Sequence, residues 1–491
     1  MSFLRQRWVQ VLALTALLAG TGIYSMKWKF AVTDFDTWWH LKVGDWIVEN
    51  SALPHTGILS RTAADRPWVA YSWGYEVLLS RAYAWFGLIG IGVVGTVLTV
   101  GVVFSTYWML RRLSGRFWLA CALAGISCSA FLFTVAPRPV FFSYILFCVT
   151  LTLLLEAQRT GRIQLLYWLP LGFVIWANLH IQFVYGLFTL ALFVAVHLSQ
   201  QILSRFGFAL GFLSPSRLPA KSLIAVLGAS FVATLVGPNT YHPYLVVLAY
   251  TKAKFAYKII IELQPLPFRT LNNFVELLLA AAGFYAVGWR KKLDPFQMAL
   301  LVVGSVVSFR TMRDAWFISL SAAACIANFP APDGAPHLSD SWRELAVVTV
   351  TVALLLFLAA PLTNFTTRGL DRAISADYPV NAINFLRRNS FSGPLYNNLN
   401  WGGFLMWYLP ELPVAIDGRN DLYGDDLDSL FYYSESAYPS YKTDPYLNES
   451  GIVVLQSKLP LAKVLTIDSR FRLVYRDEIA TVFTRNDVAM R

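Results

Sequence analysis

The chain has 491 residues, of which 56% are hydrophobic and only 14% charged, and its mean hydropathy is +0.51. A soluble globular protein carries about 25% charged residues, so much of this chain must lie in lipid. The formal net charge is +11, but the basic residues form no continuous tract, which argues against nucleic acid as a partner. The sequence contains no Walker-type Gly-rich loop, no Gly-x-Ser-x-Gly elbow and no His-Glu-x-x-His motif.

Eleven apolar runs are predicted to be membrane helices, because about 30 Å of hydrocarbon requires roughly 20 helical residues. The runs are 8–24, 85–108, 117–136, 139–158, 163–180, 183–200, 222–236, 272–289, 294–309, 314–329 and 345–361. We interpret the first as a retained helix, since no cleavage site and soluble domain follow it. The four cysteines lie inside apolar runs without metal-ligand spacing, which predicts packing roles.

Loop charges predict the orientation of these helices, because basic residues favour short cytoplasmic loops. Arg5 and Arg7 place the N-terminus in the cytoplasm, and alternation then makes the loops that carry the later basic clusters cytoplasmic. These clusters are Arg111, Arg112 and Arg116; Arg159 and Arg162; Arg205, Arg217 and Lys221; and Arg290, Lys291 and Lys292. We therefore expect a protein integral to a bacterial inner membrane, with the loop 25–84 and the C-terminal tail exported.

The tail has a different composition. Residues 362–491 carry 13 Lys+Arg against 15 Asp+Glu, whereas the preceding 361 residues carry 27 against 14. Helical patterns occur at Tyr378–Asn389 and Leu459–Thr466, extended patterns at Pro394–Asn397, Val414–Asp417 and Ile452–Gln456, and a hairpin pattern at Phe471–Arg485. We therefore predict a transmembrane domain at 1–361, including the first outer loop, and a small exported α/β domain at 362–491.

Two carboxylates stand just after the first apolar run, in Asp34-Phe-Asp36-Thr-Trp-Trp-His40. Ionised carboxylates near a bilayer are costly to keep. In an extended backbone Asp34 and Asp36 would point to the same side, about 7 Å apart at Cα. They could accept a proton, hold a divalent cation such as Mg²⁺ or Mn²⁺, or do both. The alternative is an Asx-type cap on a helix; the placement after the first run, with His40 nearby, favours chemistry.

The same segment carries Trp38, Trp39 and Trp46, and the loop continues with Trp68 and Trp73. We expect the first three on an interfacial helix that anchors the loop at the membrane surface. Tryptophans with polar neighbours, such as Trp68 and Trp73, are typical of helices in the lipid headgroup region, which is the interpretation we favour. They could instead stack on sugar rings.

Other residues predicted on the outer side could complete a site. Arginine binds phosphate through bidentate hydrogen bonds, and the candidates are Arg138, Arg310 and Arg313. The alternative is snorkelling from helix ends, which has about equal support for Arg313. Candidate lining residues are His40, His180, Asn178 and His242, although a lone histidine is more often a structural hydrogen-bonding partner. In the tail, a polar turn or an acceptor-binding region is formed by Asp417, Arg419 and Asp421.

These features together resemble the GT-C membrane glycosyltransferases, a class that includes protein O-mannosyltransferases, aminoarabinose transferases and oligosaccharyltransferase catalytic subunits. The resemblance covers nearly the whole chain and is strongest to poorly characterised bacterial GT-C-like proteins. The segments that carry it are Asp34–Leu41 with Gly44, Pro67-Trp68, Trp73–Glu76, Arg138-Pro139, Trp176–His180 and Ile416–Arg419.

The resemblance implies a polyprenyl-phosphate-linked sugar donor that enters from the membrane, and an acceptor of unknown kind. Asp36 or Asp34 would act as base or bind metal, while Arg310 and Arg138 are the phosphate candidates by their charge and side. Protein O-mannosyltransferases use adjacent acids, whereas this chain has Asp-x-Asp, so metal dependence stays open. The alternative is a non-catalytic scaffold or lipid-handling subunit of a cell-surface polysaccharide or glycolipid assembly system.

Overall fold

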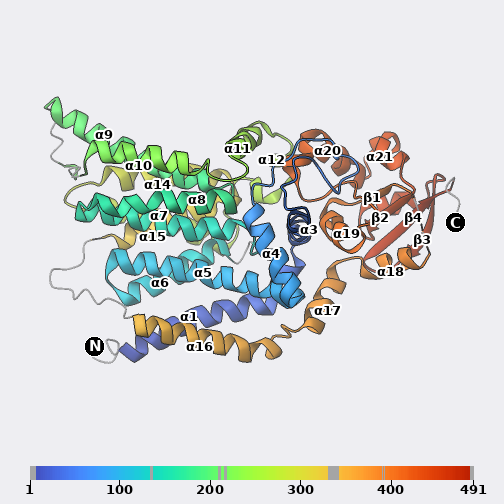
Figure 1. Ribbon diagram of the computed structural model, residues 1–491, viewed down its shortest axis with the longest axis horizontal. Helices are drawn as coiled ribbons and strands as arrows, with labels where there is room; N and C mark the ends of the chain where they lie inside the picture. Colours follow the sequence, from blue (N-terminus) through green and yellow to red (C-terminus); the bar gives the residue numbers. More distant parts are fainter. Residues whose placement is uncertain are drawn as a thin grey trace. The chain divides into compact units, whose positions relative to one another are not determined.

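The computed structural model describes residues 7–132, 136–207, 212–214, 218–329, 342–389, 391 and 393–486. The chain forms two compact units, each built from three segments (Figure 1). Unit 1 comprises Met1–Trp28, Gly95–Tyr241 and Ile260–Thr363, and unit 2 comprises Lys29–Val94, His242–Ile259 and Asn364–Arg491.

This division differs in one respect from the domains predicted from sequence. The end of unit 1 at Thr363 lies close to the predicted boundary, but the first outer loop groups with the tail and not with the membrane helices. The physical reason is hydrogen bonding between the two segments. The backbone N–H of Arg61 donates to the carbonyl of Val414, and the Thr62 hydroxyl donates to the carbonyl of Ala415.

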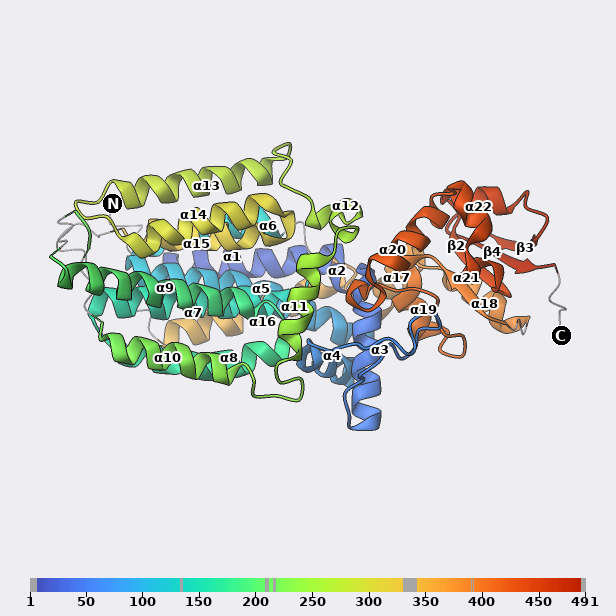
Figure 2. The ribbon, with the colours of Figure 1, turned by 90° about the horizontal axis from the view of Figure 1, so that it is seen from above.

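Unit 1 is a bundle of helices that run side by side in both ribbon views (Figures 1 and 2). Its helices are α1 (Arg7–Trp28), α5 (Leu88–Ser114, which begins in unit 2), α6 (Phe117–Phe131), α7 (Val140–Thr160), α8 (Leu169–Leu179, preceded by a 3-10 turn at Ile163–Trp168), α9 (Phe183–Arg205), α10 (Ala220–Ala233), α13 (Leu271–Gly288), α14 (Pro295–Arg310), α15 (Ala315–Ala327) and α16 (Trp342–Leu362). Each predicted span corresponds to one of these helices.

Six helical stretches in the described part of the chain are long and apolar enough to cross a membrane. They are Arg7–Thr33, Leu88–Ser114, Val140–Thr160, Phe183–Arg205, Leu271–Gly288 and Trp342–Leu362. Four further apolar helices are shorter: Phe117–Phe131, Ile163–Leu179, Ala220–Ala233 and Pro295–Arg310. The polytopic membrane fold is therefore confirmed, while the number of eleven spans remains a prediction.

Helix α15 forms the centre of the bundle and packs against α13, α14 and α6. Its side chains are almost all buried and many are small, including Ser319 and the run Ala322–Ala324. Small residues allow helices to approach closely where no hydrophobic effect drives them together. By contrast, α16 exposes Val350, Phe357 and Leu362, as expected of a lipid-facing surface.

Two of the predicted cytoplasmic loops meet in the structure. Arg112 forms a bidentate ion pair with Glu156, and Arg159 donates to the carbonyl of Leu113. Arg5 and Arg217 lie outside the described residues. The orientation of the protein in its membrane remains a prediction.

Unit 2 contains a four-stranded sheet with the strand order β1-β2-β4-β3. The strands are β1 (Leu395–Asn397), β2 (Ile452–Gln456), β3 (Phe471–Arg476) and β4 (Ala480–Arg485). β1 pairs with β2 in parallel, and the other pairs are antiparallel. The predicted strands at 394–397 and 452–456 and the hairpin at 471–485 are therefore confirmed.

The helices of unit 2 come from all three of its segments. They are α2 (Phe30–Thr33), α3 (Phe35–Asn50), α4 (Trp73–Phe86), α11 (His242–Lys252), α12 (Ala256–Ile259), α17 (Thr367–Asp377), α18 (Val380–Arg388), α19 (Gly402–Tyr408), α20 (Asn420–Glu435), α21 (Pro445–Asn448) and α22 (Pro460–Leu465). α18 and α22 confirm the two helices predicted in the tail. α22 packs on β2, and α18 packs on β3 and β4.

Candidate active site

The site is built at the start of α3, where Asp34 occupies the N-cap position and Asp36 lies in the first helical turn. The predicted extended geometry is therefore wrong for this pair. Asp34 is the predicted cap by position, but its side chain makes no capping hydrogen bond. Asp34 is buried, whereas Asp36 is half-buried. Only Asp36 thus offers a carboxylate with substantial access to solvent.

The aromatic residues of α3 explain why this segment is helical. Trp38 is fully buried, with its ring 5.3 Å from that of Phe404 and 5.9 Å from that of Tyr378. Trp39 is also buried, and only Trp46 of the three is half-exposed. The interpretation of Trp38 and Trp39 as headgroup anchors is therefore wrong, because both belong to the core of unit 2.

Two contacts fix the Asp36 carboxylate. Trp39 Nε1 donates a hydrogen bond to Asp36 Oδ1 at 3.1 Å. On the other side the same oxygen lies against Gly418, where an added Cβ would be only 2.3 Å from it. A side chain at 418 would therefore displace the Asp36 carboxylate from its present position.

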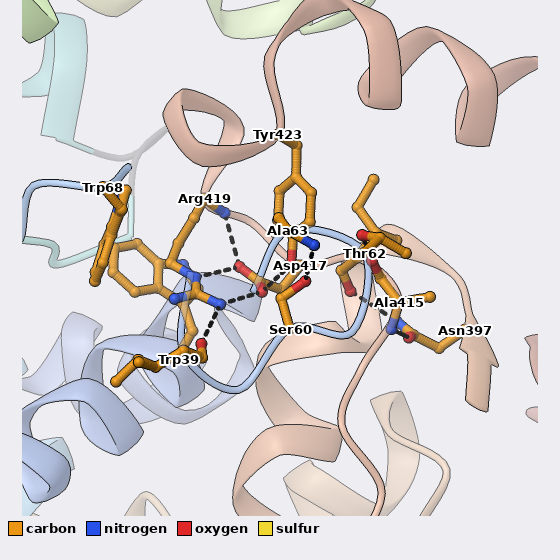
Figure 3. Close-up of polar contacts among 12 residues, drawn as sticks. Trp39, Ser60, Thr62, Ala63, Trp68, Asn397, Ala415, Asp417, Arg419 and Tyr423 are labelled. Atoms are coloured by element: carbon orange, nitrogen blue, oxygen red, sulfur yellow. Dashed lines mark hydrogen bonds and ion pairs between the residues drawn. The ribbon is translucent and has the colours of Figure 1, made fainter. Parts of the chain in front are cut away.

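Gly418 lies in the chain between Asp417 and Arg419, which form one buried ion pair. Figure 3 shows this ion pair. Asp417 and Arg419 have no exposed side-chain surface, and they form two hydrogen bonds, Nε–Oδ1 at 2.9 Å and Nη2–Oδ2 at 2.8 Å. The Tyr423 hydroxyl donates to Asp417 Oδ2 at 2.6 Å. These two charges neutralise each other inside unit 2, so neither forms the acceptor-binding surface considered from sequence.

The ion pair also connects the tail to the first outer loop. Arg419 Nη2 donates to the carbonyl of Ile58, and the backbone at Val414 forms an isolated parallel bridge with Ser60. The predicted strand at Val414–Asp417 therefore joins this loop and not the four-stranded sheet. Asn397 reinforces the arrangement, since its Oδ1 accepts from the Ala415 N–H.

A second tryptophan–aspartate pair lies beside the first. Trp68 Nε1 donates to Asp421 Oδ2 at 3.0 Å, and the Arg419 guanidinium lies 4.9 Å from the Trp68 ring. The rings of Trp39 and Trp68 meet edge to face at 6.3 Å. Burial raises the pKa of Asp421 to about 6. Asp421 is half-buried, so of the three tail candidates it alone retains access to solvent.

His40 does not line an open site. Its Nδ1 lies 3.2 Å from Glu76 Oε1, and both side chains are buried between α3 and α4. Burial raises the pKa of Glu76, and the hydrogen bond from His40 opposes that shift. Gly44 allows the two helices to pack closely, since a Cβ there would lie 2.0 Å from the carbonyl of Glu76. His40 and Glu76 therefore stabilise the packing of α3 against α4.

In unit 1, two of the predicted phosphate-binding arginines lie in one polar region at helix ends. Arg138 Nη1 is 3.7 Å from Glu262 Oε2. Arg313 lies in the 3-10 turn Met312–Asp314, which packs on the turn Ile261–Leu263 that carries Glu262. Arg310 ends α14 with its side chain exposed. The region is tied together by backbone bonds, including Leu266 N–H to the carbonyl of Phe309.

The remaining lining candidates have mainly structural surroundings. His180 Nδ1 lies 2.8 Å from Ser143 Oγ, which also accepts from Trp176 Nε1. Asn178 Nδ2 donates to the carbonyls of Val174 and Val236, each at 2.8 Å. His242 is exposed at the start of α11.

Metal binding at this site remains a prediction. Among the described residues, no group of three or more His, Cys, Asp or Glu side chains could hold a metal ion. Asp34 and Asp36 are two carboxylates that differ in burial, Asp34 being buried and Asp36 half-buried.

Sequence spacing did not reveal the importance of Gly418, Tyr423 or the loop 58–63. Their roles depend on contacts between segments more than 300 residues apart, such as that between Arg419 and Ile58. The only local signal was the run Asp417-Gly-Arg-Asn-Asp421, which marks a polar turn but not its burial.

Comparison with known proteins adds the fold class. Neither a protein-family model nor a curated protein matches the chain. Among solved structures, the archaeal oligosaccharyltransferase AglB from Archaeoglobus fulgidus, in complex with an inhibitory peptide and a dolichol-phosphate, matches with a TM-score of 0.50 and 11% identity, over 98% of this chain and 75% of that one. The protein has a GT-C-like fold. This GT-C-like protein is accordingly an integral membrane protein.

A second solved structure, ArnT from Cupriavidus metallidurans bound to undecaprenyl phosphate, has a TM-score of 0.44 and 11% identity. The match covers 97% of each chain.

Proposed function

We propose that the protein is a membrane glycosyltransferase that moves a sugar from a polyprenyl-phosphate donor to an acceptor on the exported side. The observation that carries this proposal is the half-buried Asp36 carboxylate, held between Trp39 and Gly418 in the first outer segment of a GT-C-like fold. The dolichol-phosphate in the AglB structure supports a lipid phosphate as the kind of donor.

In the proposed reaction Asp36 accepts a proton from the nucleophilic group of the acceptor. The acceptor then attacks the anomeric carbon of the sugar, and the bond from this carbon to the phosphate oxygen breaks. The polyprenyl phosphate leaves with the bonding electrons and one additional negative charge. Arginine stabilises such a charge through its planar fork, the role we propose for Arg310, Arg138 and Arg313.

A scaffold without catalytic activity is the second candidate. It is favoured by the burial of Asp417, Arg419, His40 and Glu76, which shows that much of the polar sequence serves the fold. A scaffold could still bind lipid phosphate, but it would not consume the donor.

The test uses the full-length protein in nanodiscs with radiolabelled polyprenyl-phosphate mannose, glucose and arabinose as probes. We expect one of these donors to bind and, when acceptor is present, to be converted to polyprenyl phosphate as its sugar passes to the acceptor. Binding without conversion of any donor in membranes that contain native acceptors would support the scaffold, and absence of binding would contradict both candidates.

Arg310 provides a sharper variant of this experiment. Arg310→Ala should weaken donor binding more than Arg310→Lys, because lysine keeps the charge but loses the bidentate geometry. Arg162→Ala is the matched control, since Arg162 is also exposed but is predicted on the opposite side. Equal donor affinity in all four proteins would remove Arg310 from the site.

A further inference from the structure

Helix α11 (His242–Lys252) belongs to unit 2 and exposes apolar side chains on one side. Leu245 is 50% and Leu248 56% exposed, and Lys252 is exposed one turn further along. These residues are three and four positions apart and therefore share one side of the helix. The opposite side, which includes Pro243 and Tyr250, is buried or half-buried. We call Leu245, Leu248 and Lys252 the α11 face.

The segment that carries this face is basic, although the Asp425 carboxylate lies beside its C-terminal end. Residues 242–261 contain three lysines, Lys252, Lys254 and Lys258, and no aspartate or glutamate. Each lysine is exposed. A short apolar stripe bordered by lysines is complementary to an anionic lipid surface, where leucines enter the acyl boundary and lysines lie among the phosphates.

The position of the α11 face is fixed by its anchor at the C-terminal end. The Asp425 carboxylate accepts hydrogen bonds from the backbone N–H groups of Lys254 at 2.7 Å and Phe255 at 3.0 Å. The Phe255 ring packs against Tyr432 and Tyr433, each at 5.7 Å between centroids. These contacts orient α11 through its buried side and leave the face uncovered by other described residues.

The connections of α11 to its neighbours along the chain lead to apolar helices. Only residues 234–241 separate it from the apolar helix α10, and this linker can extend no more than about 28 Å. On its other side the chain leads to α13, which is long and apolar enough to cross a membrane.

We propose that the α11 face binds the surface of an anionic membrane, with Leu245 and Leu248 in the lipid and Lys252 and Lys254 on lipid phosphates. This interaction is independent of the proposed sugar transfer and would hold equally for a scaffold. It gives unit 2 a lipid contact of its own, separate from the helices of unit 1.

The experiment places a fluorophore on the α11 face of the full-length protein. Leu248→Cys is labelled with NBD in a background without other cysteines, and Ile467→Cys, an 88% exposed apolar position in the tail, is the matched control. The proteins are placed in nanodiscs of phosphatidylcholine alone or with about 30% phosphatidylglycerol. Quenching is measured with a 5-doxyl lipid and with aqueous iodide, and thermal unfolding checks that each variant is folded.

We expect the lipid quencher to act at least threefold more strongly at position 248 than at 467, and iodide to act less. The lipid quenching should increase with phosphatidylglycerol, and Lys252→Glu with Lys254→Glu should remove that increase. Equal iodide quenching at both positions would overturn the proposal. Shielding from iodide without lipid quenching would also overturn it and would indicate a protein partner. Lipid quenching that does not change with phosphatidylglycerol or with the lysine variants would overturn it as well.

Discussion

Asp36 contacts Gly418, and Asp417 is the residue before this glycine in the chain, yet the two carboxylates have different surroundings. Asp36 is half-buried and accepts a hydrogen bond from Trp39. Asp417 is fully buried and is bound by Arg419 and Tyr423. Both residues stand in prominent polar motifs, so the motif alone does not distinguish them. Exposure and partners do: Asp417 supports the fold, whereas Asp36 is the residue for which we propose chemistry.

The largest expected effect on folding comes from Asp417→Asn. This change leaves the Arg419 guanidinium buried without a balancing charge, which typically costs about 3–5 kcal/mol. We expect poor expression or a large drop in the melting temperature of the full-length protein in detergent. Asp426→Asn is the matched control in the same region, because its ion pair with Arg66 is largely exposed and should contribute less than about 1 kcal/mol. Similar melting temperatures for the two variants would contradict the supporting role of Asp417 in the fold.

Gly418→Ala tests the contact that joins the two regions. A Cβ at this position would lie 2.3 Å from Asp36 Oδ1 and 3.0 Å from Trp39 Nε1, so the carboxylate must move. We expect transfer activity to fall by about tenfold to a hundredfold, since small misplacements of a catalytic group are costly. Gly172→Ala is the control, because no neighbouring atom lies within 4 Å of its added Cβ. Unchanged activity in Gly418→Ala would show that the position of Asp36 does not depend on the tail.

The last stability prediction concerns Asp428. This carboxylate is buried like that of Asp417, but no described residue forms an ion pair with it as Arg419 does with Asp417. Burial and nearby aspartates raise its pKa to about 8, and Oδ1 has no hydrogen-bond partner in the described part of the chain. Because folding raises this pKa, the folded protein keeps the proton while the unfolded chain ionises, so stability falls as the pH rises from about 4 to about 8. Asp428→Asn removes this loss and should therefore raise the melting temperature more at pH 8 than at pH 4. A melting-temperature difference independent of pH would contradict this assignment.

Much of the fold was predictable because its signals are local. Each apolar run became a helix, and the alternating pattern at 471–485 became the β3–β4 hairpin. The helical start of α3 was the alternative considered from sequence, but the packing of Phe35 on Tyr378 and of Trp38 on Phe404 could not be predicted, because these partners lie more than 300 residues away. Likewise, nothing near Val414 in sequence indicates that it pairs with Ser60.

The burial of the candidate site residues could not be predicted from the sequence, and their roles remain predictions. Asp36, Arg310 and Asp421 retain exposed surface, as ligand-binding groups must. Arg419 and His40 have the same polar character in sequence, but both are buried against partners from distant segments. Burial of a charge depends on long-range pairing, which one sequence does not reveal.

The most direct test of the account is transfer activity in Asp36→Asn, measured with whichever polyprenyl-phosphate sugar the wild type converts. The substitution keeps the size and most hydrogen bonds of the side chain and removes its basicity. We predict a loss of about a hundredfold or more, as for a general base, with a melting temperature near that of the wild type. Asp34→Asn should reduce activity less, because that side chain is buried. Full activity in a folded Asp36→Asn protein would contradict the mechanism.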